Sequence, residues 1–310
     1  MTETVKTLLT TYEVRKTKQQ KEAFRAFLCR ELEALGYAPR VETRRSLVTS
    51  RNVVAGDPDK AKVLFTAHYD TCAVLPFPNF LTPRNPVVFA LFQLAVAALF
   101  LALAVAVELA GLLLFDLPLW AALLVMYAAL GFCIWWMLAG KANRHTANDN
   151  TSGVATLLEI AAALPADRRE AVCLVFFDNE EKGLFGSSAF AAAHPAAKND
   201  ALVLNFDCVG DGDFLQFFPK KAVKEDPAAL ALLEEAFLSE GGKTVEVVRG
   251  VGIYPSDQAA FRRGVGIAAF RRAPVIGYYM GRIHTRRDTV LEEENVALLR
   301  RGALRLAGTL

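Results

Sequence analysis

The chain has 310 residues, enough for one large α/β domain with a full core or for two small domains. Its 35 basic and 33 acidic residues give a net charge of +2, so the composition indicates no nucleic-acid partner. Hydrophobic residues make up 53% of the chain, with the excess concentrated between residues 86 and 140. The five cysteines form no CxxC pair and the N-terminus has no apolar signal core, so we expect a reducing compartment and no cleaved secretory peptide.

The first seventy residues predict a helix and a buried strand. Apolar residues recur at helical spacing from Phe24 to Leu35, and Gly36 followed by Pro39 ends this helix. Residues 62–67 (KVLFTA) form a short apolar run, which is typical of a strand.

Two long apolar segments come next. Residues 87–107 and 117–139 comprise 21 and 23 residues without a charge. At a rise of ~1.5 Å per residue, each helix is about 30 Å long or longer, enough to cross the core of a bilayer. A turn at residues 108–116, which contains Glu108 and Asp116, joins them in the predicted transmembrane hairpin.

The residues that flank the hairpin indicate its orientation. All three tryptophans lie near the ends of the second segment, as in an aromatic belt at a membrane interface. Arg84 precedes the hairpin, and Lys141 and Arg144 follow it, whereas the connecting turn carries only acids. The positive-inside rule therefore predicts a two-pass protein with its main domain and both termini in the cytoplasm. The alternatives are the core hairpin of a soluble protein and a hydrophobic dimerisation arm.

Downstream of the hairpin, helices and apolar strands alternate. We predict helices over 151–164 and 228–238 and from Glu292 onward, and strands over 171–177, 202–206 and 266–270. This pattern predicts an α/β fold with a mostly parallel twisted sheet covered by helices on both faces. In such sheets, functional sites form beyond the carboxyl ends of the strands.

Side chains that bind metals follow three of these strands directly. They are His68 and Asp70 after the first, Glu180 and Glu181 after the second and Asp207 after the third, and two loops add Asp149 and His284. Two metal ions ~3.5–4 Å apart can activate a water and stabilise an oxyanion in amide hydrolysis. Imidazole and carboxylate groups are suitable ligands for zinc and for other divalent metals. A carboxylate outside the ligand set must take the proton of the water, and the adjacent Glu180 and Glu181 suit such a division of roles.

The motifs HYDT, NDNTSG, DNEEKGLFGS, NFD and HTRRDT, in this order, resemble the M28 family of zinc aminopeptidases, the aminopeptidase-S/leucyl aminopeptidase group. RNVVAG and SDQAAF are also similar to that family. The resemblance implies a zinc-exopeptidase-like fold with two Zn²⁺ ions. The resemblance further implies that His68 and Asp207 bind one ion, that Glu181 and His284 bind the other, and that Asp149 bridges the two ions. It implies in addition that Glu180 is the general base and that Asp70 supports His68. Asp257, in SDQAAF, falls near the site of the family without an assigned role.

The sequence departs from this pattern in two places. His68 and Asp149 are 81 positions apart, and 26 remain without residues 86–140, which is ordinary for the family. We therefore expect a metallopeptidase domain of residues 1–85 and 141–310, with the hairpin of residues 86–140 inserted in it. In addition, Ile283 stands where some members have an oxyanion-stabilising tyrosine, and Tyr278 and Tyr279 are the candidate replacements.

Simpler interpretations apply to the remaining histidines and cysteines near these motifs. His145 is interpreted as a loop residue and His194 as a surface residue, whereas Cys72 and Cys208 are interpreted as packing residues.

The predicted function is a membrane-anchored aminopeptidase that acts on peptides. One alternative is a related zinc amidohydrolase, such as a one-metal glutaminyl cyclase or an M20-type deacylase. The deacylase is disfavoured because the chain after Asp207 is too short for the usual extra domain. Another alternative is an inactive receptor or scaffold with this fold, although no ligand of the set is missing.

Overall fold

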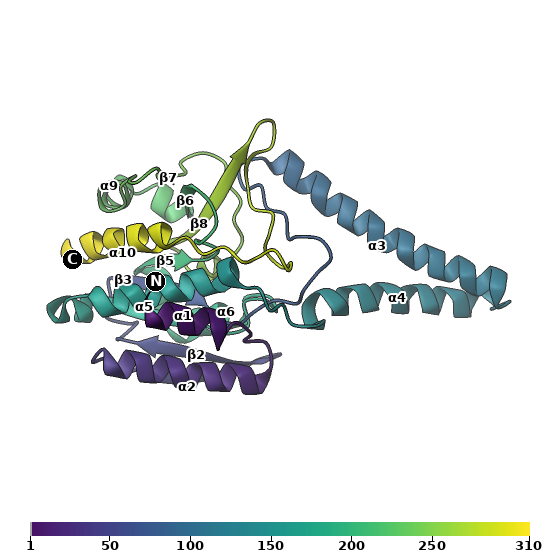
Figure 1. The fold of residues 1–310 in the computed structure, drawn as a ribbon, viewed down its shortest axis with the longest axis horizontal. Helices are drawn as coiled ribbons and strands as arrows, with labels where there is room; N and C mark the ends of the chain where they lie inside the picture. Colours follow the sequence, from purple (N-terminus) through teal and green to yellow (C-terminus); the bar gives the residue numbers. More distant parts are fainter. Residues whose placement is uncertain (1) are drawn as a thin grey trace.

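The computed structural model describes residues 2–310, and in this range nine strands form one sheet (Figure 1). The strands are β1 (Arg40–Arg45), β2 (Thr49–Ala55), β3 (Val63–His68), β4 (Val172–Phe177), β5 (Leu202–Phe206), β6 (Phe214–Pro219), β7 (Thr244–Val247), β8 (Gly264–Ala273) and β9 (Gly277–Tyr279). The helices are α1 (Glu3–Thr10), α2 (Lys18–Ala34), α3 (Pro86–Leu114), α4 (Leu119–Ala139), α5 (Gly153–Ala163), α6 (Phe185–Ala193), α7 (Pro195–Asn199), α8 (Lys221–Lys224), α9 (Pro227–Ala236) and α10 (Glu293–Gly308). Short helical turns are η1 (Ala147–Ser152), η2 (Ala166–Ala171) and η3 (Asp257–Ala260).

Parallel strands form the centre of the sheet. The strand order is β1-β2-β4-β3-β5-β8-β6-β7, with β9 paired to β8. The neighbours β4, β3, β5 and β8 run parallel, so that Val63 of β3 lies opposite Val172 on one side and Leu202 on the other. The outer pairs β1–β2, β2–β4 and β6–β8 are antiparallel. The sheet is therefore mixed, and the strands that the sequence predicts are those of its parallel centre.

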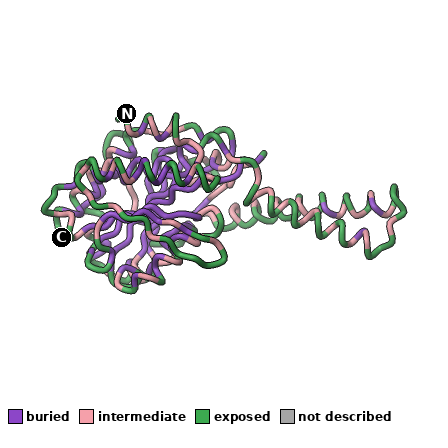
Figure 2. Tube along the Cα trace, turned by 90° about the horizontal axis from the view of Figure 1, so that it is seen from below, coloured by how far each residue is buried: buried purple, intermediate pink, exposed green. Residues whose placement is uncertain are grey.

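Helices cover both faces of the sheet, as predicted. Successive side chains of a strand point to opposite faces, and along β4 Leu174 packs on one side and Cys173 on the other. The first face is covered by α1, α2, α5, α9 and α10, and the second by α6 and α7. Buried residues accordingly lie at the centre of the domain (Figure 2).

The first core helix begins and ends on local sequence signals. Thr17 and Gln20 form a reciprocal capping box at the start of α2, which satisfies two backbone N–H groups. After the helix, Gly36 adopts a φ of 81°, which a residue without a Cβ adopts readily. The predicted end of this helix at Gly36 is confirmed.

The apolar hairpin projects away from the domain (Figures 1 and 2). At ~1.5 Å per residue, α3 with 29 residues is about 44 Å long and α4 with 21 residues is about 32 Å long. Both helices are long and apolar enough to cross a membrane. In each of them, only 6% of the most apolar stretch of 18 residues is buried. The alternative of a buried core hairpin is therefore wrong.

The turn of the hairpin is shorter than predicted. Residues 108–114 continue α3, and only 115–118 connect it to α4. These seven residues are mainly leucine, alanine and glutamate, which favour a helix, whereas Asp116 has a left-handed φ of 48° and Pro118 caps α4. Small residues line the contact between the helices, because Ala104, Gly111 and Ala122 are the buried positions.

The base of the hairpin is tied to the domain by backbone hydrogen bonds. The segment before α3 meets the residues after α4, because Ala73 pairs with Ala142 and Val74 N–H donates to the Lys141 carbonyl. Leu75 N–H donates to the carbonyl of His284 at 2.7 Å. The segment that leads into α3 therefore packs along the loop that carries His284.

Candidate metal centre

The fold brings the predicted site residues together at the carboxyl ends of the parallel strands. His68 is the last residue of β3, Glu180 and Glu181 follow β4, and Asp207 follows β5. Asp149 lies in η1 before α5, and His284 lies in the loop between β9 and α10. Because the ends of parallel strands meet at one edge of a sheet, residues more than 200 positions apart in sequence become neighbours.

Two groups of donor atoms share one carboxylate, and a third group, of His68, Glu180 and Glu181, overlaps both. His68 Nε2 lies 3.4 Å from Asp149 Oδ1 and 3.5 Å from Asp207 Oδ1. His284 Nε2 lies 3.2 Å from the other oxygen of Asp149 and 3.5 Å from Glu181 Oε2. Within each group the donor atoms lie within 4.8 Å of one another. One carboxylate oxygen of Asp149 thus faces His68, and the other faces His284.

These groups fit divalent metal ions. Two ligands of a tetrahedral zinc, each about 2.0–2.2 Å from the ion, are roughly 3.3 Å apart, close to the spacings found here. Among residues 2–310, Glu181 Oε1 and Asp207 Oδ1 are buried without a hydrogen-bond partner. Buried polar atoms are normally satisfied, so these oxygens indicate a missing cationic partner.

Asp70 organises the centre in two ways. Its carboxylate accepts hydrogen bonds from the backbone N–H groups of Glu180 at 3.0 Å and of Glu181 at 3.3 Å. His68 Nδ1 lies 3.1 Å from the Asp70 carbonyl and 3.6 Å from its carboxylate, so that Nε2 points to the donor group. Such partners fix the orientation of a metal-binding imidazole. Asp70 therefore positions both His68 and the two glutamates.

The carboxyl groups of the centre differ electrostatically. Burial favours the neutral form of Asp149, but hydrogen bonds with His284 and His68 outweigh it and lower its pKa below the usual aspartate value. Burial raises the pKa of Glu180 well above its usual value; His68 opposes this shift, and Glu181 and Asp207 add to it. The raised pKa makes the Glu180 carboxylate a stronger proton acceptor than an exposed glutamate.

Several residues that the sequence analysis missed hold the donor loops. Asp288 accepts from the backbone N–H groups of Asn148 at 2.7 Å and Asp149 at 3.0 Å, which fixes η1. Ser256 donates to Asp207 Oδ2 at 2.6 Å. Asn150 donates to the carbonyl of Phe206, which joins η1 to the end of β5. Asn150 and Ser256 lie in the motifs NDNTSG and SDQAAF, so the motifs carried a signal for them.

Arg15 is a buried cation beneath the centre. Its guanidinium donates to the carbonyls of Tyr69 and Tyr12 and to the hydroxyl of Thr151, and the side chain is fully buried. Burial lowers the pKa of Arg15 to about 10, while Asp70 and Asp149 favour its charged form. The cation offsets part of the negative charge of the carboxylate cluster.

Of the two histidines outside the donor groups, one differs from its interpretation from the sequence. His194 is only 9% exposed and both ring nitrogens lie 2.8 Å from a carboxylate, of Asp59 and of Glu42, so the prediction of a surface residue is wrong. The reason is that α6 ends over the loop before β3 and the edge strand β1. His145 is exposed, and in the described part of the chain it belongs to none of the donor groups, as expected of a loop residue.

Comparison with known proteins assigns the chain to a family. The sequence model of peptidase family M28 matches residues 136–307, more than half of the chain. The chain belongs to peptidase family M28. The matched part of this M28 chain contains Asp149, Glu180, Glu181, Asp207 and His284. His68 and Asp70 lie before it, and the pairing of β3 between β4 and β5 places them beside the matched residues.

Solved structures share the fold of this M28 chain. A glutaminyl cyclase from Porphyromonas gingivalis is 17% identical with a TM-score of 0.64, covering 98% of this chain and 95% of that chain. A leucine aminopeptidase precursor from Bacteroides thetaiotaomicron is 18% identical with a TM-score of 0.60, covering 97% and 93%. A Zn-dependent exopeptidase from Parabacteroides distasonis is 16% identical with a TM-score of 0.59, covering 98% and 94%. A search among curated proteins gives no match.

The near-site candidates of this M28 chain differ in their surroundings. Asp257 is fully buried, neither carboxylate oxygen has a hydrogen-bond partner among the described residues, and burial raises its pKa to about 7. Tyr278 packs on Phe214, and Tyr279 packs on Phe80. Tyr254, which the sequence analysis missed, donates from its buried hydroxyl to the Asp207 carbonyl at 2.9 Å.

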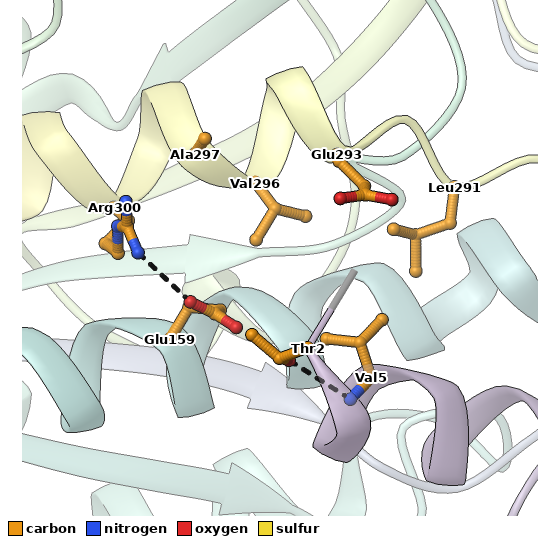
Figure 3. Close-up of a pocket in the computed structure, with 8 residues that line it drawn as sticks. All are labelled: Thr2, Val5, Glu159, Leu291, Glu293, Val296, Ala297 and Arg300. Atoms are coloured by element: carbon orange, nitrogen blue, oxygen red, sulfur yellow. Dashed lines mark hydrogen bonds and ion pairs between the residues drawn. The ribbon is translucent and has the colours of Figure 1, made fainter.

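The M28 chain has a cavity among its helices and a groove at the base of the hairpin. A cavity of about 210 Å³ between α1, α5 and α10 contains the ion pair of Arg300 with Glu159 and no residue of the donor groups (Figure 3). A groove of about 550 Å³ lies at the base of the hairpin, next to His284. It is lined by Val74, Leu75, Pro76, Trp136, Lys141, Thr285, Arg286 and Arg287. No residue of the donor groups lines the groove, but its lining residue Thr285 follows His284 directly in sequence.

Proposed function

We propose that this chain is a zinc-dependent hydrolase with two Zn²⁺ ions that removes N-terminal residues from peptides. The observation that carries the proposal is the pair of donor groups that share Asp149, one oxygen facing His68 and the other facing His284. When bound, the metal ions supply an activated water and charge for the oxyanion. Membership of peptidase family M28 supports peptide hydrolysis.

Glu180 is the proposed general base. Its raised pKa makes it a stronger proton acceptor than an ordinary carboxylate, and its backbone N–H donates to the Asp70 carboxylate. The Glu180 carboxylate takes a proton from the attacking water and later gives it to the nitrogen of the leaving amine. The neighbouring Glu181 points to His284 and the metal position there, so the two glutamates have separate roles.

A second candidate function is glutaminyl cyclisation, because the fold is similar to that of a glutaminyl cyclase. Such an enzyme joins the N-terminal amine of a glutaminyl peptide to its own side-chain carbonyl and releases ammonia. Both reactions require a free N-terminal amine, so the product distinguishes them.

A peptide panel tests the proposed activity. The purified zinc-loaded protein is incubated with peptides that have a free N-terminus, their N-acetylated versions and a peptide that begins with glutamine, and products are identified by mass spectrometry. We expect loss of the first residue from free peptides and no reaction of acetylated ones. Loss of ammonia from the glutamine peptide without cleavage favours the cyclase, and preferential reaction of acetylated substrates favours a deacylase. No turnover by zinc-loaded protein favours the receptor.

We further propose that residues 86–140 span a bilayer as a hairpin inserted in a domain of residues 1–85 and 141–310. The exposed apolar surfaces of α3 and α4 support this, since monomeric soluble proteins rarely expose large apolar patches. Lys141, Arg286 and Arg287 line the groove at the hairpin base, where cytoplasmic anionic headgroups attract cations. The domain and both termini are proposed to be cytoplasmic. A membrane-proximal peptide is the proposed substrate class, because the segment that leads into the hairpin is bonded to the backbone of His284 through Leu75.

Membrane fractionation tests the hairpin. We expect the full chain in the membrane fraction, where it resists extraction with alkaline carbonate. A variant with a Gly/Ser linker in place of residues 86–140 should be soluble, with its metal content unchanged. This linker must reach from Asn85, whose side chain donates to the Ile276 carbonyl, to Lys141, whose carbonyl accepts from Val74 N–H. A full chain that is soluble and dimeric, and a variant that is monomeric, instead support the dimerisation arm.

A further inference from the structure

Cys72 lies inside the metal centre rather than in the apolar packing around it. It follows His68 by four positions and is 1% exposed. Its Sγ and the donor atoms of Asp149, Glu181 and His284 all lie within 4.8 Å of one another. Of the cysteines between residues 2 and 310, no other joins a donor group. This placement differs from the packing role expected from the sequence.

The surroundings of Cys72 leave its sulfur available for a cation. Asn143 Nδ2 approaches the sulfur at 3.8 Å, but the same nitrogen donates to the His145 carbonyl at 2.6 Å and to the Thr285 carbonyl at 3.0 Å. An amide nitrogen has two hydrogens, so these shorter contacts satisfy it. The contact with sulfur is therefore secondary.

A second observation concerns Glu181, whose carboxylate belongs to the same donor group as this sulfur. The side chain of Glu181 is 9% exposed, and its Oε1 has no hydrogen-bond partner among the described residues. Its Oε2 already faces His284 at 3.5 Å. A buried carboxylate with an unsatisfied oxygen needs a positive partner, and no lysine or arginine forms an ion pair with Glu181 in the described chain.

We propose that the Cys72 thiolate is a fourth protein ligand of the metal ion held by Asp149, Glu181 and His284. On coordination the S–H bond breaks, the proton leaves to solvent and a sulfur–metal bond forms. Thiolate is a preferred zinc ligand, with a Zn–S distance of about 2.3 Å. The proposal rests on the proposed metal-dependent function of the same centre.

The two metal positions then differ in character. The position with Cys72 has four protein donors, as in closed structural zinc sites, whereas the position of His68, Asp149 and Asp207 has three, as in open catalytic sites. The second position therefore has more room for a water molecule.

Cobalt and cadmium substitution of the full-length protein tests the ligand. The apoprotein is loaded with Co²⁺, the bound metal is counted, and the absorption spectrum is recorded. We expect a thiolate-to-cobalt charge-transfer band that Cys72→Ser removes, together with a fall of about tenfold or more in metal affinity at one position. Cys208→Ser is the matched control and should keep the charge-transfer band. Cys208 is also buried beside a candidate ligand, Asp207, but belongs to no donor group among residues 2–310.

Cadmium NMR of the wild-type protein gives a measurement that does not depend on a folded variant. We expect two ¹¹³Cd resonances, of which one has the downfield shift of a sulfur ligand. Bound metal without a sulfur signature, or a band that Cys72→Ser keeps, overturns the role of Cys72 and leaves the proposed function standing. Failure to bind any metal overturns both.

Discussion

The substitution Asp149→Ala should remove both metal ions and all measurable peptidase activity. Asp149 is 4% exposed, and its two oxygens lie 3.4 Å from His68 and 3.2 Å from His284. Each metal position loses a ligand in this variant. Removal of even an outer-shell partner lowers metal affinity by about 10–100-fold. We therefore expect metal affinity to fall by at least ~100-fold at both positions. Zinc counted per chain after dialysis measures this, against two for the wild type.

Asp167→Ala is the control for Asp149. Its side chain is 73% exposed in η2, and this variant should keep both ions and full activity. Circular dichroism of Asp149→Ala beside chelator-treated wild type separates loss of metal from loss of fold. Retention of two zinc ions by Asp149→Ala contradicts the shared-carboxylate arrangement.

The substitution Glu180→Gln should reduce kcat by about 10²–10⁴-fold while both metals stay bound. The amide has nearly the same size but cannot accept a proton, and the backbone N–H of residue 180 can still donate to Asp70. Glu180→Ala should behave in the same way. Glu181→Gln, in contrast, should lose metal from the position next to His284.

Single-turnover kinetics and metal counts of the same samples separate the two glutamates. The exposed Glu170, at the opposite end of β4, provides a matched Glu→Gln control that should change neither quantity. Full activity of Glu180→Gln would sink the general-base assignment, and loss of metal from this variant would make Glu180 a ligand.

The parallel centre of the sheet and its donor residues were predictable because their signals are local. Each central strand is a continuous apolar run, and the residues that follow it directly, such as His68, Glu180 and Asp207, are polar. Parallel pairing then brings these strand ends together by geometry alone. The antiparallel outer strands were harder to predict, since β1 (RVETRR) is largely exposed and has no apolar run.

Some supporting residues of the centre lie in the quoted motifs, as Asn150 and Asp288 do, but the partners of the supporting residues follow from tertiary contacts. Arg15 lies in an ordinary polar segment, and its partner Thr151 is 136 positions away. Asp288 holds η1 across 140 positions. Cys72 resembles any small buried residue in the sequence, and only the return of the chain at Asp149 and His284 places it among ligands. His194 was misread for the same reason, because its carboxylate partners come from β1 and from the loop before β3.

The hydrogen bond between Leu75 and the carbonyl of His284 has a mechanical consequence. Leu75 belongs to the segment that leads directly into α3, and Leu81 in the same segment pairs with Met280, four residues before His284. With the hairpin in a bilayer, the 21-residue uncharged run of α3, about 32 Å long, nearly matches a hydrocarbon core of about 30 Å, and a thinner bilayer is accommodated by tilting. A change in tilt pulls on a segment bonded to the backbone of a candidate ligand. Bilayer thickness and the geometry of the hydrolytic centre are thereby physically linked.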